Sequence, residues 1–169
     1  MCSSDLPHLA FWLVHYASAG FGIFTVGTGG GKVLGTEGNL RLMQKVQPEA
    51  LIGMPTFLYH VLQHAVEEGL RVPSLKRLVL GGEKAAEGIR RKLRNLAAKL
   101  GAPEVDVLAT YGFTESKMAW AECPVPADEA PSGYHLYPDH SIIEVVDPKT
   151  GQVRPEGEPG EIVFTPLDA

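Results

Sequence analysis

Short apolar runs and amphipathic stretches alternate through the middle of this chain. Three apolar runs of strand length occupy residues 50–53, 77–80 and 105–109. Between them, two stretches carry apolar side chains at the spacing of one helix face, over residues 55–66 and 89–100. A strand–helix–strand unit of this length gives parallel strands joined by right-handed crossovers. The pattern therefore predicts an α/β fold with a mostly parallel sheet and flanking helices.

The two predicted helices have defined ends. Pro55 suits the first position of one helix, and Gly69 and Gly101 suit the C-terminal caps of the two. The second helix also carries a run of basic residues, and the simplest interpretation is that most of them face water. They are Arg90, Arg91, Lys92 and Arg94.

More elements are expected upstream and downstream of this unit. Residues 22–26 indicate another strand, and Leu40, Met43 and Val46 indicate a further helix.

Beyond Cys123 the composition changes, because Pro and Ala crowd the next eight positions. Short strands are then predicted at residues 134–136, 141–146 and 160–165, with a turn at residues 147–151. These pieces favour a small, partly antiparallel β region. We therefore expect an α/β part over residues 7–123 and a β-rich continuation over residues 124–169.

The bulk composition narrows the class of protein. The chain has 169 residues, enough for one domain with a core, and its net charge of -5 argues against a general nucleic-acid binder. Two cysteines give no disulfide framework, which fits a reducing compartment. The apolar stretch at residues 9–14 is too short to span a bilayer and lacks the basic flank of a signal peptide. We expect a cytoplasmic protein with no nucleic-acid or membrane partner.

Both ends of the chain look cut. Residues 1–6 resemble a translated adapter remnant and are left out of the fold prediction. At the other end, only four residues follow the strand pattern at residues 160–165. A domain rarely finishes on an apolar strand without a closing element, so we expect a fragment of a longer protein.

The stretch from Tyr111 to Glu115 carries candidate nucleotide chemistry at the end of a predicted strand. An aromatic ring can stack on a base, and Gly112 can let the backbone come close to a ligand. The Thr114 hydroxyl can donate to a phosphate, and the Glu115 carboxylate can help to hold Mg²⁺. The alternative is an ordinary strand-to-loop turn with a packed tyrosine.

The topology brings two more loops into the same prediction. In open parallel sheets, ligands lie outside the carboxyl ends of the strands. Here those ends carry residues 54–56, 81–84 and 110–115. We therefore expect three loops to converge on one rim of the sheet.

One group of residues has the side chains of a soft-metal site. Cys123 and His135 are its main members, together with Glu122, Asp139 and His140. Their spacing matches no standard zinc module. A structural metal on Cys123 and His135 is one hypothesis, and a buried cysteine with hydrogen-bonded strand histidines is the alternative.

Four motifs in order give the chain a family resemblance. They are Gly81-Gly82-Glu83, Tyr111-Gly112-Phe113-Thr114-Glu115, Gly133-Tyr134-His135 and the stretch from Gly157 to Thr165. In this order, they make the chain resemble the adenylate-forming ligases, and most closely the phenylacetate–coenzyme A ligase group, from about Phe11 to the end.

The resemblance implies a large α/β N-terminal domain, of which this chain is a part, and a small mobile C-terminal domain. It implies ATP, Mg²⁺ and coenzyme A, an aromatic or other carboxylic acid as substrate, and a possible homodimer. By position, Gly81, Gly82 and Glu83 would line the adenine and Tyr111 would stack on it. Thr110, Gly112 and Phe113 would complete the nucleotide site, while Thr114 and Glu115 would be catalytic, contacting phosphate and magnesium respectively.

The chain also departs from this family. It lacks the upstream Ser/Thr/Gly-rich phosphate loop, the Tyr-Arg-Thr-Gly-Asp stretch that holds the ribose, and the catalytic lysine of the small domain. We therefore expect the chain to be inactive by itself. A non-catalytic nucleotide-binding module and a ligase that loads a carrier protein are the alternatives.

Overall fold

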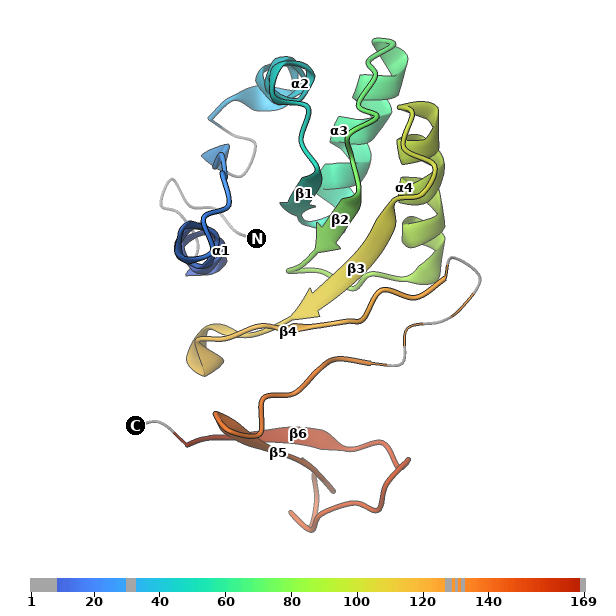
Figure 1. Ribbon diagram of the computed structural model, residues 1–169. Coiled ribbons are helices and arrows are strands. Elements are labelled where there is room, and N and C mark those ends of the chain that lie inside the picture. The colour runs from blue at the N-terminus through green and yellow to red at the C-terminus, as the bar shows by residue number, and fades with distance from the viewer. Residues whose placement is uncertain (1–8, 30–32, 127–128, 130, 132, 168–169) are drawn as a thin grey trace.

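The computed structural model describes residues 9–29, 33–126, 129, 131 and 133–167 (Figure 1). The suspected adapter remnant at residues 1–6 lies outside the described residues. The proposed division of the chain at residue 123 stays a prediction.

A four-stranded sheet forms the centre of the fold. Its strands β1 (Ala50–Gly53), β2 (Arg77–Leu80) and β3 (Asp106–Tyr111) are parallel neighbours, with Leu51 opposite Leu78 and Leu78 opposite Val107. The predicted parallel sheet is therefore confirmed. A short strand that the sequence pattern did not indicate, β4 (Trp120–Ala121), pairs antiparallel with β3. Two residues are too few to show a periodicity of their own.

Two helices cover one face of this sheet (Figure 1). They are α3 (Pro55–Glu67) and α4 (Glu87–Lys99), close to the predicted bounds. The side chains of Leu62, Leu78 and Leu93 are fully buried between helices and sheet. Burying a leucine side chain contributes about 1.5–3 kcal/mol relative to exposing it, so these contacts hold the layers together.

The end of α3 follows from its sequence. Gly69 has a φ of 68°, in the left-handed region, and its N–H donates to the carbonyl of Val66. The N–H of Leu70 donates to the carbonyl of Ala65, which completes a two-bond helix cap. A side chain at residue 69 would be strained in this conformation.

One basic residue of α4 does not face water as expected. Arg90 is only 4% exposed and forms an ion pair with Glu122, which follows β4. Its position borders the apolar face of the helix, so the long side chain can reach inwards to the carboxylate. A helical wheel cannot reveal such a partner, because Glu122 belongs to a distant part of the chain.

Two further helices precede the sheet. The predicted helix around Leu40 and Met43 is confirmed as α2 (Gly35–Val46), whereas α1 (Leu9–Gly20) was not predicted. Across the described part of the chain, no helix combines the length and the apolar character needed to cross a membrane.

The predicted strand at residues 22–26 is wrong. This segment begins in a turn at Gly22 and belongs to no sheet, and Phe24 is 80% exposed. Its apolar character resembles that of a strand, but a strand needs a hydrogen-bonded neighbour, and none of the described strands pairs with it.

A second, two-stranded sheet follows the first. Its strands β5 (Ser141–Val146) and β6 (Glu161–Pro166) are antiparallel, in a register that runs from Ser141 opposite Pro166 to Val146 opposite Glu161. Both strands lie within one residue of the predicted bounds, and the predicted turn after β5 forms. The strand predicted at residues 134–136 is wrong, because Tyr134 makes only an isolated bridge to Glu122.

Candidate functional site

The carboxyl ends of β1, β2 and β3 lie side by side, as the parallel order requires. The N–H of Gly81 donates to the carbonyl of Gly53 over 3.1 Å. The hydroxyl of Thr110 donates to the carbonyl of Leu80 over 3.0 Å. These bonds link each loop to its neighbour, so the predicted convergence of three loops is confirmed.

Glu83 ties the second loop to the start of α3. Its carboxylate accepts the backbone N–H of Thr56 at 3.2 Å and the Thr56 hydroxyl, whose oxygen lies 2.8 and 2.9 Å from the two carboxylate oxygens. Met54, at the N-cap of α3, makes no side-chain cap, so Glu83 supplies one from outside the helix. A negative charge is favourable at this helix end. The carboxylate therefore helps to define the loop that holds Gly81 and Gly82.

Two glycines of the predicted site are required by the fold itself. A Cβ atom on Gly81 would lie 2.9 Å from the hydroxyl oxygen of Thr110. A Cβ atom on Gly112 would lie 2.7 Å from the carbonyl oxygen of Met118, across the turn between β3 and β4. The sequence suggested that Gly112 makes room for a ligand, but here the neighbour that excludes a side chain is the turn.

The turn between β3 and β4 presents the two candidate catalytic residues. Thr114 and Glu115 begin a 3₁₀ turn, Thr114–Ser116, and both side chains are exposed. Neither side chain makes a hydrogen bond or an ion pair within the described part of the structure. Both are therefore accessible to a ligand at the end of the sheet.

Ser116 anchors this turn, and sequence reasoning missed it. The residue is 5% exposed, and its hydroxyl oxygen lies 2.7 Å from the carbonyl oxygen of Phe113 and 3.1 Å from that of Met118. A serine within a polar loop gave no signal of burial, since hydroxyls in loops are mostly exposed. These hydrogen bonds tie together the two ends of the segment that carries Thr114 and Glu115.

Tyr111 stands at the edge of an aromatic cluster. Its side chain is 44% exposed and stacks on Trp120, with ring centroids 5.8 Å apart and an interplanar angle of 22°. The ring of Tyr134 also contacts the Tyr111 ring, with centroids 6.0 Å apart. The tyrosine is therefore packed on part of its surface and open on the rest, which combines the two interpretations drawn from the sequence.

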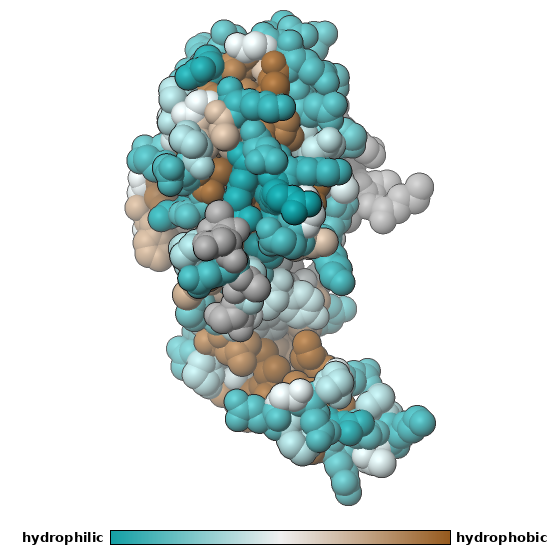
Figure 2. Space-filling view, turned by 90° about the vertical axis from the view of Figure 1, so that its right-hand side faces the viewer, coloured by the Kyte–Doolittle hydropathy of each residue, from teal (hydrophilic) through white to brown (hydrophobic). Residues whose placement is uncertain are grey.

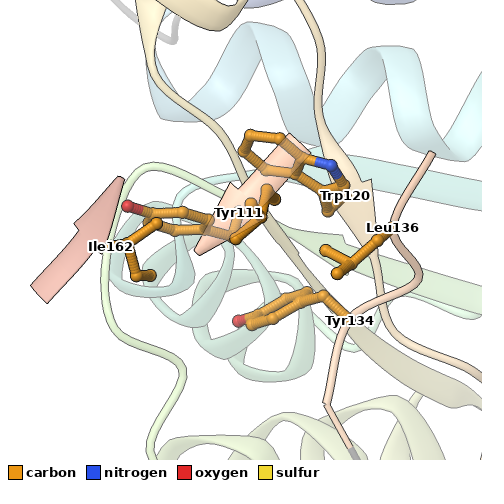
Figure 3. A pocket seen from close by; sticks show the side chains of 6 residues that line it. Tyr111, Trp120, Tyr134, Leu136 and Ile162 are labelled. Atoms are coloured by element: carbon orange, nitrogen blue, oxygen red, sulfur yellow. The ribbon is translucent and has the colours of Figure 1, made fainter. Parts of the chain in front are cut away.

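A small apolar cavity of about 90 Å³ adjoins this cluster (Figure 3). Drug-sized ligand sites usually measure roughly 300–1,000 Å³, so a nucleotide cannot lie inside this cavity. Apolar surface gathers at the waist between the main body and the β5–β6 sheet (Figure 2). The cavity is lined by Tyr111, Trp120, Tyr134, Leu136, Ile143 and Ile162.

The ionisation of Tyr134 depends on this environment. Burial of the phenol raises its pKa above the ordinary value of 10.0, and the nearby charge of Glu122 raises it further. The positive charge of Arg90 opposes this shift without cancelling it. The Tyr134 phenol is therefore neutral at physiological pH.

The proposed soft-metal group is only partly assembled. The Sγ atom of Cys123 lies 2.6 Å from Nε2 of His135, but Glu122 is paired with Arg90 and His140 lies beside Asp139. Within the described residues, no three His, Cys, Asp or Glu side chains gather in a metal-binding arrangement. A structural metal on Cys123 and His135 stays a prediction: the fold brings these two side chains together but uses Glu122 elsewhere. The buried cysteine of the alternative is not found, because Cys123 is exposed.

The chain is similar in sequence to known ligases. It is 30% identical to a phenylacetate-coenzyme A ligase of Aromatoleum evansii, over 98% of this chain and 37% of that protein. It is 32% identical to a phenylacetate-coenzyme A ligase of Thermus thermophilus, over 88% of this chain and 35% of that protein. The chain thus spans about a third of the length of these relatives.

Solved structures share the fold. A 2-hydroxyisobutyryl-CoA ligase matches with a TM-score of 0.75 and 21% identity, over 95% of this chain and 33% of that chain. A long-chain-fatty-acid-CoA ligase from Archaeoglobus fulgidus matches with a TM-score of 0.70 and 19% identity, over 94% of this chain and 32% of that chain.

The family model described as AMP-binding enzyme matches residues 2–165. This match covers nearly the whole chain, including the three loops at the carboxyl ends of the strands and the turn that carries Thr114 and Glu115. The resemblance drawn from the ordered motifs is confirmed, and the chain belongs to the AMP-binding enzyme family.

Proposed function

We propose that this chain forms the adenylate-binding part of an AMP-forming acid–coenzyme A ligase. The observation that carries this proposal is the rim at the carboxyl ends of β1–β3. There Thr110 is bonded to the strand that ends at the Gly81–Glu83 loop, and the exposed Tyr111, Thr114 and Glu115 follow it. Ligands of open parallel sheets lie at such an edge. The relatives that are named phenylacetate-coenzyme A ligases support an aromatic carboxylic acid as the substrate class.

The proposed reaction has two steps. A carboxylate oxygen of the acid bonds to the α-phosphorus of ATP while the bond to pyrophosphate breaks, which gives an acyl-adenylate. The coenzyme A thiol then loses its proton to solvent, its sulfur bonds to the acyl carbon, and AMP leaves with the electron pair of the broken C–O bond. Both steps depend mainly on positioning and on stabilising negative charge.

Each exposed residue of the rim has a proposed role. The open part of the Tyr111 ring would hold the adenine, and the Gly81–Glu83 loop, with Thr110, would border the base. The Thr114 hydroxyl would donate to a phosphate oxygen as charge builds there. Gly112 and Phe113 would act through the shape of the turn, since Gly112 faces its own backbone.

The structure of the Glu115 side chain fits a magnesium ligand. Its carboxylate is exposed and makes no ion pair within the described residues, and Mg²⁺ sites with nucleotides commonly use one or two carboxylates with phosphate oxygens. Magnesium bound there would neutralise charge on the phosphate oxygens. Glu115 would hold that charge close to the Thr114 hydroxyl, on the same turn.

The test is the variant Glu115→Gln in the complete protein that carries this sequence. We expect ATP-dependent pyrophosphate exchange to fall about 10²-fold or more, while the Kd for ATP changes much less. The exchange is measured with a panel of aromatic and aliphatic acids, which also identifies the substrate. The matched control is Glu104→Gln, at an exposed position away from the rim.

Two outcomes would contradict this proposal. A small and equal effect of Glu115→Gln on exchange and on ATP binding would remove the magnesium role. ATP binding without exchange for any acid would favour a non-catalytic nucleotide-binding module.

A further inference from the structure

Arg90 and Glu122 form a two-pronged ion pair beneath the rim. Nη1 and Nη2 of Arg90 each lie 2.8 Å from one carboxylate oxygen of Glu122. The two side chains are only 5% and 6% exposed. A guanidinium and a carboxylate that meet through two parallel bonds are fixed in orientation as well as in distance.

The pair is also bonded to the backbone of the segment before α4 and of strand β3. Nε of Arg90 donates to the carbonyl of Ala85 over 2.9 Å, and Nη1 lies 3.2 Å from the carbonyl of Val107. One carboxylate oxygen of Glu122 accepts the N–H of Ala109 over 2.7 Å. The charges are therefore well satisfied, which a buried pair requires.

These backbone partners lie next to the proposed nucleotide loops. Ala85 follows the Gly81–Glu83 loop, and Ala109 directly precedes Thr110 and Tyr111. Glu122 follows β4, and its N–H donates to the carbonyl of Ala109, so it extends the ladder that closes the Thr114–Ser116 turn. One ion pair thus contacts the base of both loops.

Stability alone gives a weak reason for such a pair. Replacing a buried ion pair by apolar side chains of similar volume is often neutral or stabilising, because desolvating the charges offsets much of their attraction. A rigid fork does supply what an apolar contact lacks, a single orientation between α4 and the β3–β4 hairpin.

We propose that the Arg90–Glu122 ion pair is a positioning element that couples the Gly81–Glu83 loop to the β3–β4 turn, so that both loops receive one nucleotide in register. The proposal rests on the proposed function, since the coupled loops are those that would hold adenine and phosphate. Arg90 and Glu122 would act through Ala85, Ala109 and the turn without touching the nucleotide.

The central test is the paired apolar variant Arg90→Met/Glu122→Leu in the complete protein. It removes both charges together, so neither is left buried and unpaired. We expect it to fold with a Tm within a few degrees of the parent. We expect the KM for ATP in pyrophosphate exchange to rise about tenfold or more, with kcat also reduced, because small misplacements of a site cost large factors in rate.

Amide hydrogen exchange gives a second readout that needs no nucleotide. In the paired variant, residues 81–86 and 111–119 should both exchange faster, while the core of α3 stays protected. The proposal would be overturned if the KM for ATP and the amide hydrogen exchange of these two segments both stayed unchanged, whatever happens to Tm. A purely structural role would lower Tm without moving the KM of the folded fraction.

A second variant keeps the proposal testable if the paired variant does not fold. Arg90→Lys retains the positive charge but loses the fork, so it should also raise the KM for ATP and loosen both loops. No change in either quantity would overturn the coupling. The matched control is Glu87→Gln/Arg94→Gln, a partly exposed ion pair on α4 with an N···O distance of 3.1 Å, which should change neither.

Failure of the proposed function can be distinguished from failure of this inference. If the parent protein neither binds ATP nor catalyses pyrophosphate exchange, the proposed function is wrong. Amide hydrogen exchange alone then tests the coupling of the two loops. Faster exchange in both segments would support the coupling, and faster exchange in one segment or in neither would overturn it.

Discussion

The two sheets of this protein are stabilised in different ways. The four-stranded sheet packs one face against α3 and α4, and Leu62, Leu78 and Leu80 are fully buried there. In the β5–β6 sheet only the two ends of β5, Ser141 and Val146, are buried. The first sheet is held by a helix-covered core, whereas the second is held mainly by its own ladder of hydrogen bonds.

The two sheets meet through aromatic rings. Phe164 of β6 packs edge-to-face on Phe113, with centroids 5.3 Å apart, and on Trp120 at 5.8 Å. Such pairs contribute roughly 0.5–1.5 kcal/mol each beyond simple burial. Phe113 immediately precedes the turn with Thr114 and Glu115. The less buried sheet therefore contacts the candidate site directly, while the well-packed sheet supplies its foundation.

Large-to-small substitutions should give the largest difference between the sheets, in the free energy of unfolding that each loses. Leu62→Ala, at a fully buried position, should lower the free energy of unfolding by about 2–5 kcal/mol, because it leaves a cavity under the first sheet. Ile142→Ala, at a position 49% exposed in β5, should cost much less. Urea denaturation followed by circular dichroism measures both values. Equal losses would mean that the second sheet is as tightly packed as the first.

An intermediate effect is expected where the sheets meet. Phe164→Ala removes both edge-to-face contacts, so amide exchange in β5 and β6 should become faster while β1–β3 keep their protection. Phe164→Leu keeps apolar volume without the ring, so its amide exchange rates in β5 and β6 should lie between those of the parent and of Phe164→Ala. Equal acceleration in both sheets would show that they unfold as one cooperative unit.

The smallest effect concerns pH. Because burial and Glu122 raise the pKa of Tyr134, the native state favours the neutral phenol. The contribution of Tyr134 to stability is then complete below pH 10.0 and is lost as the pH rises through the raised pKa. Tyr134→Phe should flatten this alkaline loss, as measured by urea denaturation at several pH values above 9. An unchanged profile would mean that other groups cause it.

Much of the first sheet was predictable because its signals are local. The helix spacing around Leu58 and Leu93, the cap at Gly69 and the apolar runs of β1–β3 all agree with each other. Agreement between local preferences and the tertiary fold is what makes a sequence pattern reliable. The same reasoning placed the three loops on one rim.

The errors fall where long-range partners decide the outcome. Residues 22–26 have the composition of a strand but no paired neighbour among the described strands, and residues 134–136 make a single bridge. Arg90 has the composition of a surface residue, yet Glu122, which follows β4, draws it inwards. The spacing of residues along the chain contains no information about such pairings.

The order of apolar and polar residues was enough to predict the layers of this protein, because burial of one helix face and of short apolar strands depends on local periodicity. It also determined that Tyr111, Thr114 and Glu115 follow a buried strand. The folded arrangement was needed to show that Glu83 caps α3, that Ser116 anchors the turn and that Arg90 joins Glu122 under the rim. These contacts bring together side chains whose shape and charge matter only once the chain has folded.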